Sequence, residues 1–446
     1  MNNINSLTNI TENDAPVYFL DLTVKNVRCF GKEQTLDLSA GNGKPARWTI
    51  ILGDNGVGKT TLLKCLVALE LREDIREANK VIPTGIDVDM QLFSFSRYED
   101  EDCSISTSKF YKSSLNSEKY STINGYNLDI IKKRYFVSPT SFVGMKELVV
   151  YPYGALRRMG NGSLDNSNSD RAINLFLEDV SLINAVEWLL QADYAVKSSA
   201  AEGKSYFENR YEKVKNMLID LLPDVGNIRT KPITKTQSKP AIEFETPYGW
   251  VSLRDLSLGY QTLIAWIVDL AHRLFERYSD YDNPLEQPAI VLVDEIDLHL
   301  HPKWQRTVID HLTAIFKQTQ FIVTAHSPLI VQSAPEDANI VLLKRHGDRV
   351  IIHNNEEVIK GWRIDQVLTS DLFALPSARP AEYDNYLKKQ EKILSKPQLT
   401  PADEQELEEI GKKLDELPIV TDNPEDNEAM AILRKAADIF KTNYKI

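Results

Sequence analysis

The feature that most constrains the fold of this chain is a glycine-rich loop between an expected strand and an expected helix. The loop runs from Gly53 to Thr60, reads GDNGVGKT and matches the pattern G-x-x-x-x-G-K-[ST]. An apolar run over 48–52 precedes it, and a helical apolar pattern over 61–67 follows it. In this setting the glycines let backbone N–H groups surround phosphate oxygens, and the helix N-terminus adds partial positive charge. A strand–helix turn that binds nothing is the alternative, and both flanks count against it.

Side chains in two parts of the chain fit the chemistry of such a loop. Lys59 is placed to reach the β- and γ-phosphates of a nucleotide, and Thr60 to offer its hydroxyl to Mg²⁺. Asp294 and Glu295 end a second apolar strand, over 288–293. We expect Asp294 to hold the water shell of the Mg²⁺ and Glu295 to polarise the attacking water as a general base.

Histidines follow two of the expected strands. His326 ends the apolar strand that begins at 321, where it can sense a γ-phosphate and orient the water, and a structural role is the alternative. His299 and His301 lie beyond Asp297, which follows Glu295 in a turn. A His-x-His pair can bind a metal, but two histidines alone make a poor site, so the sequence favours a structural turn.

Composition limits the remaining functions. A chain of 446 residues, 42% hydrophobic and 26% charged, can bury a large core. Its net charge of −12 argues against general binding to nucleic acid, so such a contact needs a local basic patch or a partner. The three cysteines form no metal pattern, the N-terminus lacks a signal-peptide pattern, and no apolar run reaches the roughly 18 residues of a membrane span. We therefore expect a cytoplasmic protein with no membrane segment.

The remaining patterns predict a mixed α/β chain. Alternating apolar residues predict strands within 17–37, 87–95, 147–154, 242–251 and 338–353. Helical spacing predicts helices within 171–222, 263–275, 362–373, 383–394, 400–417 and 425–444. The polar segment over 97–130 is expected to be irregular with a short hairpin. The last helices could cover the core or dock a second protein.

Two short motifs have more than one interpretation from the residues alone. Arg157 and Arg158 follow the strand within 147–154 and could face phosphate or DNA, or be plain surface charges. Ser257 is a plausible cap of the apolar helix that follows it, and Gly259 allows close approach of another backbone.

With these residues in order, the chain resembles the ABC-type ATPase family that includes RecF, the SMC proteins and ATPases of bacterial anti-phage systems. The run over 22–30 looks like that family's first strand, 53–60 like its Walker A loop, 256–261 like its signature motif and 291–295 like its Walker B strand. The resemblance implies an α/β P-loop NTPase of the ABC-ATPase type, with a mixed sheet, flanking helices, a helical insert and a helical C-terminal extension.

The same resemblance divides the chain and assigns its site. The implied parts are a first ATPase lobe with the Walker A loop (1–160), a helical insert (161–240), a second lobe with the signature, Walker B and switch histidine (241–355), and the C-terminal extension (356–446). Glu295 and His326 would be catalytic, and Thr60 and Asp294 would hold Mg²⁺. The implied ATP-binding residues are Gly53, Asp54, Asn55, Gly56, Val57, Gly58, Lys59, Thr60, Thr61, Ser257, Gly259, Gln261 and the D-loop residue Asp297.

The sequence departs from the family pattern in two places. The signature carries Leu258 where transporters carry a glycine, a variant common among the non-transporter members. No convincing Q-loop glutamine is found, and Tyr153-Gly154-Ala155 stands roughly where one would be sought.

By resemblance, one chain holds an incomplete site, and two chains meet head to tail, or within a higher oligomer, with ATP between Lys59 of one and Ser257 of the other. Tyr153-Gly154 and the segment over 365–370 look most like the PtuA-type ATPases of Septu and some retron systems. That likeness implies a partner HNH nuclease, with nucleic acid reached through the complex and no nuclease centre in this chain. A DNA-loading repair ATPase of the RecF type is the alternative, and an ABC transporter cassette is disfavoured by the early strands, the missing glutamine and the C-terminal extension.

Overall fold

The computed structural model describes most of the chain and divides it into two compact units. The described residues are 16–41, 43–73, 81–83, 102–113, 120–124, 127–131, 134–137, 148–160, 173–177, 180–233, 235, 239–354, 361–375, 377–378, 380, 383–396 and 399–415. The first unit comprises 1–367 and 371–373, and the second 368–370 and 374–446. The strand expected over 87–95 and the helix expected over 425–444 lie outside the described residues. No described helix combines the length and the hydropathy needed to cross a bilayer.

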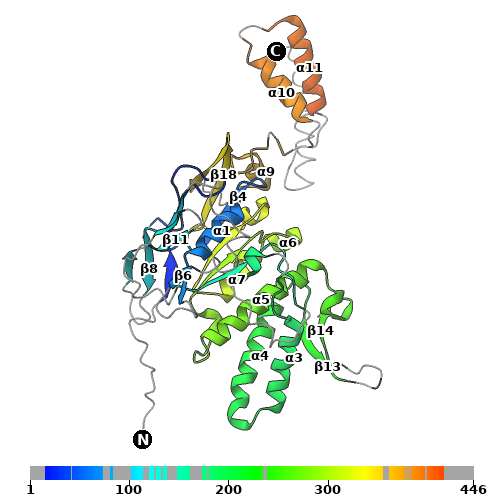
Figure 1. Ribbon diagram of the computed structural model, residues 1–446. Helices are drawn as coiled ribbons and strands as arrows, with labels where there is room; N and C mark the ends of the chain where they lie inside the picture. Colours follow the sequence, from blue (N-terminus) through cyan, green and yellow to red (C-terminus); the bar gives the residue numbers. More distant parts are fainter. Residues whose placement is uncertain are drawn as a thin grey trace. The chain divides into compact units, whose positions relative to one another are not determined.

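A six-stranded sheet forms the centre of the first unit (Figure 1). Its order is β12-β16-β17-β4-β18-β19, and all neighbours run parallel except β18 and β19. The strands are β12 (Val150–Tyr153), β16 (Ala289–Val293), β17 (Thr319–Thr324), β4 (Trp48–Gly53), β18 (Asn339–His346) and β19 (Arg349–Asn354). Because β12, β16, β17 and β4 are parallel, the loops that follow them leave the sheet at one edge, where ligands of such sheets bind.

The central strands are apolar on both faces, as expected for a sheet that is covered on both sides. In β4, Trp48, Ile50 and Leu52 enter one hydrophobic core, while Ile51 enters the other. The first core includes residues of α3 (Ala185–Ser198), α4 (Ala201–Leu221), α5 (Leu258–Arg277) and α7 (Val308–Ile315). The second core includes residues of α1 (Lys59–Ala68). The alternation along the strands therefore fixes which helices cover which face.

Antiparallel strands lie beside this core in two further sheets, of order β11-β10-β7-β2-β3 and β1-β8-β9. They are β1 (Val17–Phe19), β2 (Asp21–Lys25), β3 (Gln34–Asp37), β7 (Cys103–Ser106), β8 (Lys109–Ser113), β9 (Tyr120–Asn124), β10 (Asn127–Ile131) and β11 (Arg134–Val137). The prediction of a largely irregular segment over 97–130 was wrong, because four of these strands lie in it. In β7 the two buried side chains alternate with two half-buried serines, so the polar face concealed the strand period.

A small antiparallel sheet, β13 (Asn227–Lys231), β14 (Ala241–Thr246) and β15 (Gly249–Ser252), precedes α5. The sequence predicted β14 and β15 but not β13. Glu243 of β14 forms ion pairs with Lys231 and Arg229 of β13. Hydrogen bonds from Lys231 and then Arg229 hold the pKa of Glu243 below its ordinary value.

Short elements connect these parts. They are β5 (Leu71–Glu73), β6 (Val81–Pro83), α2 (Ile173–Phe176), α6 (Pro302–Gln305), α8 (Pro328–Gln332), α9 (Ile364–Thr369) and two 3₁₀ turns, Leu253–Asp255 and Pro284–Glu286.

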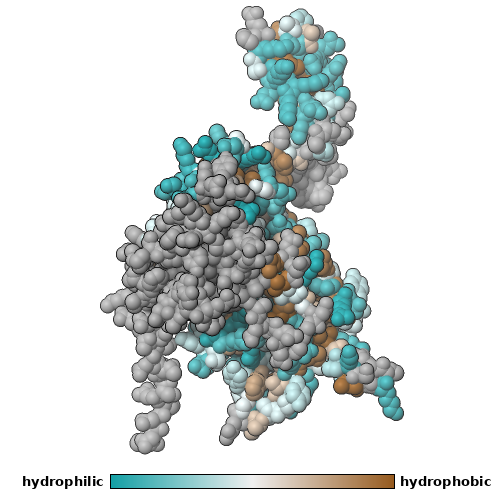
Figure 2. All heavy atoms as spheres, in the orientation of Figure 1, coloured by the Kyte–Doolittle hydropathy of each residue, from teal (hydrophilic) through white to brown (hydrophobic). Residues whose placement is uncertain are grey.

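The second unit contains a helical hairpin of α10 (Asp384–Leu394) and α11 (Pro401–Asp415), which agrees with the predicted helices. Ion pairs join the two helices and their connection, between Lys389 and Glu406 and between Lys396 and Asp403. Figure 2 shows mostly hydrophilic residues over this hairpin. The division into four functional parts at 160, 240 and 355 stays a prediction.

Candidate nucleotide-binding site

The glycine-rich loop connects β4 to α1, as its sequence pattern predicts. Gly58 stands at the N-cap of α1 with φ 93°, and a Cβ at this position would clash with the Cys29 sulfur and the Phe30 ring. Lys59 is the first residue of the helix, and its ammonium donates to the carbonyl oxygens of Gly53 at 2.7 Å and Asp54 at 3.0 Å. The ammonium of Lys59 is thus hydrogen-bonded to the same loop that would bind phosphate.

Burial lowers the pKa of Lys59, while the carboxylates of Asp294 and Glu295 raise it. The ammonium therefore lies in a partly desolvated place that faces an acidic cluster. A positive charge in such a place attracts phosphate more strongly than one in open water.

A hydrogen-bonded triad joins the loop to the end of β16. Thr60 donates to one carboxylate oxygen of Asp294 at 2.7 Å, and Thr324 of β17 donates to the other at 2.6 Å. Asp294 is 5% exposed, and its own backbone N–H donates to the carbonyl of Tyr153 at the end of β12. The neighbouring hydroxyl and carboxylate oxygens of Thr60 and Asp294 are ligands that suit Mg²⁺, which takes few protein ligands and completes its shell with water and phosphate.

Glu295 begins the turn after β16, in the left-handed backbone conformation with φ 50°. Its N–H donates to the Thr324 hydroxyl at 2.7 Å, which fixes the turn from one side. Asp297 follows, and one of its carboxylate oxygens accepts the backbone N–H of His326 at 3.1 Å. Its other oxygen is buried and accepts no hydrogen bond from the described residues. The turn after β16 and the end of β17 are therefore tied together at the edge of the sheet.

A cavity of about 290 Å³ opens beside the loop. Its described lining residues are Arg28, Cys29, Asn55, Gly56, Gly58, Lys59, Thr60, Thr61, Glu295 and His326. The structure thus brings six of the predicted loop residues together with both predicted catalytic residues, whereas Gly53, Asp54 and Val57 are not among the described lining residues. Arg28 and Cys29 were not predicted as site residues. They lie in the turn after β2, where Arg28 has a positive φ of 46°.

The signature residues lie elsewhere. None of Ser257, Gly259 and Gln261 is among the described lining residues of the cavity. Ser257 is at the N-cap of α5, as predicted, but its exposed side chain makes no capping hydrogen bond. Gln261 donates to the carbonyl of Leu256 at 2.7 Å and so holds the turn before the helix. Gly259 is buried, and a Cβ there would clash with the carbonyl oxygen of His299.

Arg157 and Arg158 differ from each other. Arg158 is exposed, whereas Arg157 is 2% exposed and donates to the carbonyl oxygens of Asp294 and Glu295, the latter at 2.9 Å. Of the two histidines, His301 caps α6 by accepting the N–H of Lys303 at 3.2 Å, which is a structural role. Among the described residues, no three histidine, cysteine, aspartate or glutamate side chains form a group that could hold a metal ion.

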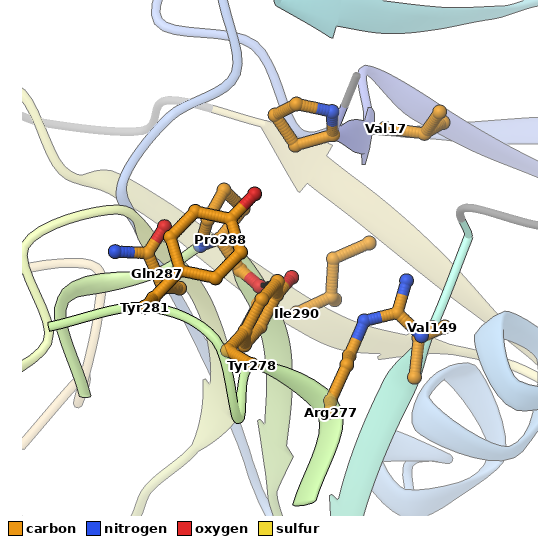
Figure 3. Close-up of a pocket in the computed structure, with 10 residues that line it drawn as sticks. Val17, Val149, Arg277, Tyr278, Tyr281, Gln287, Pro288 and Ile290 are labelled. Carbon is orange, nitrogen blue, oxygen red and sulfur yellow. Dashed lines mark hydrogen bonds between the residues drawn. The ribbon is translucent and has the colours of Figure 1, made fainter. Parts of the chain in front are cut away.

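A second, smaller cleft lies at the opposite end of β16 from Asp294 (Figure 3). Tyr278 and Tyr281 form part of its wall with their rings at 87° to each other, and the Tyr278 hydroxyl donates to the carbonyl of Pro288 at 2.6 Å. Its volume of about 30 Å³ matches a water molecule rather than a nucleotide. The cavity at Lys59 is therefore the nucleotide-sized one of these two.

The fold and these motifs define a mixed α/β P-loop NTPase with flanking helices, which confirms the predicted fold class. Two family models match, “AAA domain” over 21–140 and “AAA domain, putative AbiEii toxin, Type IV TA system” over 181–332.

The chain is similar to a Septu protein and to a retron protein described as a probable ATPase. It is 24% identical over 392 residues to “Septu protein PtuA” of Bacillus mycoides (strain KBAB4), covering 86% of this chain and 48% of that protein. It is 32% identical over 182 residues to “Retron Ec83 probable ATPase” of Escherichia coli, covering 40% of this chain and 30% of that protein. The chain therefore spans less than half the length of these curated relatives. Among solved structures, the SmcHead bound to the C-winged helix domain of ScpA aligns with a TM-score of 0.44 and 16% identity, covering 76% of this chain and 97% of that one.

Proposed function

We propose that the chain binds ATP with Mg²⁺ at the cavity beside Lys59 and hydrolyses it. The observation that carries this proposal is the hydrogen bond between Thr60 and Asp294, because it joins the phosphate loop to the acidic end of β16. Thr60 and Asp294 would hold the Mg²⁺, which would supply positive charge near the phosphates. Lys59 exchanges its two carbonyl partners for phosphate oxygens, and Glu295 accepts a proton from the attacking water.

Two copies close head to tail around the nucleotide. The support for this step is that the exposed Ser257 hydroxyl does not cap its own helix and does not line the cavity of its own chain. In the dimer, Ser257 and Gly259 at the N-terminus of α5 face the γ-phosphate held by the partner's loop, where the charge of the transition state develops.

A mixing experiment tests the composite site. Lys59→Ala removes the ammonium of the loop, and Ser257→Arg places a large side chain at the N-terminus of α5. Each variant alone should therefore release no phosphate from ATP. Mixed one to one, each heterodimer contains one intact site, which combines wild-type Lys59 with wild-type Ser257. We expect turnover to return in the mixture, to about a quarter of the wild-type value if the two variants pair at random. No recovery on mixing, with both variants folded, contradicts the head-to-tail arrangement.

A second variant separates binding from hydrolysis. Glu295→Gln keeps the size of the side chain and removes the base, so the variant should bind ATP, hydrolyse it about 10²- to 10⁴-fold more slowly and accumulate as a dimer. Analytical ultracentrifugation with and without ATP measures the dimer, and Lys59→Ala is the control that should stay monomeric. Hydrolysis by the Glu295→Gln chain at the wild-type rate shows that another group is the base.

We further propose that ATP turnover regulates a partner HNH nuclease in anti-phage defence. The support is the relationship to Septu PtuA and retron ATPases, together with the resemblance of Tyr153-Gly154 and 365–370 to the PtuA-type sequences. Co-expression with the product of the neighbouring gene tests this. An HNH nuclease whose DNA cleavage changes with ATP, and changes again with Glu295→Gln, supports the proposal. Cleavage of DNA by the isolated chain in Mg²⁺, or strong ATP-dependent binding of DNA junctions by it, contradicts it.

A further inference from the structure

Arg157 reaches the catalytic turn from a part of the chain that the motifs do not include. It lies four residues after the end of β12, in the stretch where the sequence lacks a Q-loop glutamine. Gly154 anchors this stretch, because its N–H donates to the Asn174 side chain at 2.9 Å and a Cβ there would stand 2.5 Å from the Asn174 carbonyl oxygen. The chain then bends at Arg157, which has φ 29°.

The guanidinium of Arg157 holds two successive peptide groups. One nitrogen donates to the carbonyl of Asp294, and the other donates to that of Glu295 at 2.9 Å. Glu295 is in the left-handed conformation, which is unfavourable for a residue that bears a side chain. Thr324 holds the N–H of Glu295, so Arg157 and Thr324 restrain this turn from its carbonyl and N–H sides.

An apolar side chain could fill the buried position of Arg157 without the cost of burying a charge. Burial lowers the pKa of Arg157 to about 10, against the attraction of nearby carboxylates, of which Asp294 has the largest effect. Its Nε is buried and has no hydrogen-bond partner among the described residues. A buried guanidinium with an unsatisfied nitrogen is costly, and the hydrogen bonds that its two terminal nitrogens donate to the carbonyls of Asp294 and Glu295 offset that cost.

Arg157 is also connected to the helices beside the sheet. The next residue, Arg158, accepts the N–H of Leu182 at 2.8 Å, and Gly160 donates to the Leu182 carbonyl at 2.9 Å. Leu182 leads into α3, and the N–H of Ile183 faces the buried Asp269 of α5 at 3.4 Å. The segment that carries Arg157 is therefore hydrogen-bonded to Leu182, whose neighbour Ile183 is in turn bonded to α5.

We propose that Arg157 is a positioning residue, which holds the Asp294–Glu295 turn in the orientation that hydrolysis requires. It acts through the backbone of Glu295 and from the stretch in which the family's glutamine is absent. This inference rests on the proposed function, because it needs ATP hydrolysis as its readout.

Substitution of Arg157 by methionine tests the inference. Methionine has a comparable length and donates no hydrogen bond, so the turn loses one of its two restraints. We expect kcat to fall about 10- to 100-fold, as small displacements of a catalytic group do. The affinity for a fluorescent ATP analogue should stay within about threefold of wild type, because the groups that bind phosphate are unchanged. Arg158→Met, one residue away and exposed, is the matched control and should hydrolyse at the wild-type rate.

Two further variants separate positioning from a general structural role. Arg157→Lys keeps the charge but cannot span both carbonyls, so its kcat should lie between those of wild type and the methionine variant. In a Glu295→Gln background, Arg157→Met should slow hydrolysis no further, because both changes act on the same group. If Arg157→Met lowers the hydrolysis rate in that background by the same factor as in the wild type, the inference is wrong.

The outcomes also separate this inference from the proposed function. If the wild-type chain hydrolyses no ATP, the proposed function fails. If the wild type hydrolyses ATP and Arg157→Met does so equally fast, the inference alone fails. If Arg157→Met does not melt cooperatively, Arg157→Lys decides: a folded lysine variant with wild-type kcat overturns the inference, and one with a lower kcat and unchanged affinity supports it.

Discussion

The buried carboxylate of Asp269 offers a sharp test of how α5 is held against the sheet. Asp269 lies in α5 and its side chain is 1% exposed. It accepts hydrogen bonds from Arg273 at 2.6 and 3.3 Å and from the Tyr153 hydroxyl at 3.0 Å. The Tyr153 ring also packs on Trp266, with the ring centroids 5.4 Å apart. We consider Asp269→Asn, which keeps the shape of the side chain and removes its charge.

The expected loss follows from the donors that the variant leaves without a charged acceptor. With the backbone N–H of Ile183 included, four donors face this side chain. The amide of asparagine has one oxygen for them, and its NH₂ group would face the others. Arg273, whose side chain is 18% exposed, would lose its counter-charge. Breaking a buried ion pair from one side costs about 3–5 kcal/mol, so Asp269→Asn should lower the free energy of unfolding by roughly that amount.

Urea unfolding with linear extrapolation measures this loss. Asp193→Asn is the matched control, because Asp193 pairs with Lys197 at the same i,i+4 spacing on α3, where the lysine is 64% exposed. The control should lose no more than about 0.5 kcal/mol.

A double variant checks the reasoning from the other side. Replacing both members, by Asp269→Leu and Arg273→Met, removes the charge together with its partner. We expect the double variant to be more stable than Asp269→Asn, since well-packed apolar pairs often replace buried ion pairs with little loss. The argument is refuted if Asp269→Asn loses less than about 1 kcal/mol, or if the double variant is the less stable of the two.

Three other outcomes follow from the described contacts. Gly259→Ala should destabilise the chain by about 1–3 kcal/mol in urea, since its Cβ would clash with the carbonyl of His299, whereas Gly411→Ala, with open space in α11, should stabilise its helix by about 0.5–1 kcal/mol. Thr324→Val should lower the free energy of unfolding by about 1–3 kcal/mol, because the buried carboxylate of Asp294 and the N–H of Glu295 lose their hydroxyl partner. An unchanged midpoint of urea unfolding would contradict this prediction. Hydrogen bonds from two basic neighbours lower the pKa of Glu243, so the ionised carboxylate stabilises the fold above pH 4.5 and this contribution is lost as the pH falls below that value. The difference in the free energy of unfolding between wild type and Glu243→Gln should therefore shrink as the pH falls below 4.5.

Much of the fold could be predicted because the central strands carry their signal locally. An apolar run ending in Gly53 and another ending in Asp294 each indicate a buried strand with a polar end, and parallel strands bring such ends to one edge. The strands over 103–131 were missed for the opposite reason. Their sequences contain many serine, threonine and asparagine residues, so local propensity favours a loop, and only pairing with β2 and with each other makes them strands.

The sequence by itself determined the class of this protein, because the spacing of Gly53, Lys59 and Thr60 suits phosphate in any strand–loop–helix setting. Only the tertiary structure decided which side chains meet there. Nothing local distinguishes Arg157 from Arg158, yet the bend at φ 29° buries one against the carbonyls of Asp294 and Glu295 and leaves the other exposed. Those partners are more than 130 residues away along the chain, and a hydrogen bond between such distant groups exists only once the sheet has brought the ends of β12 and β16 together.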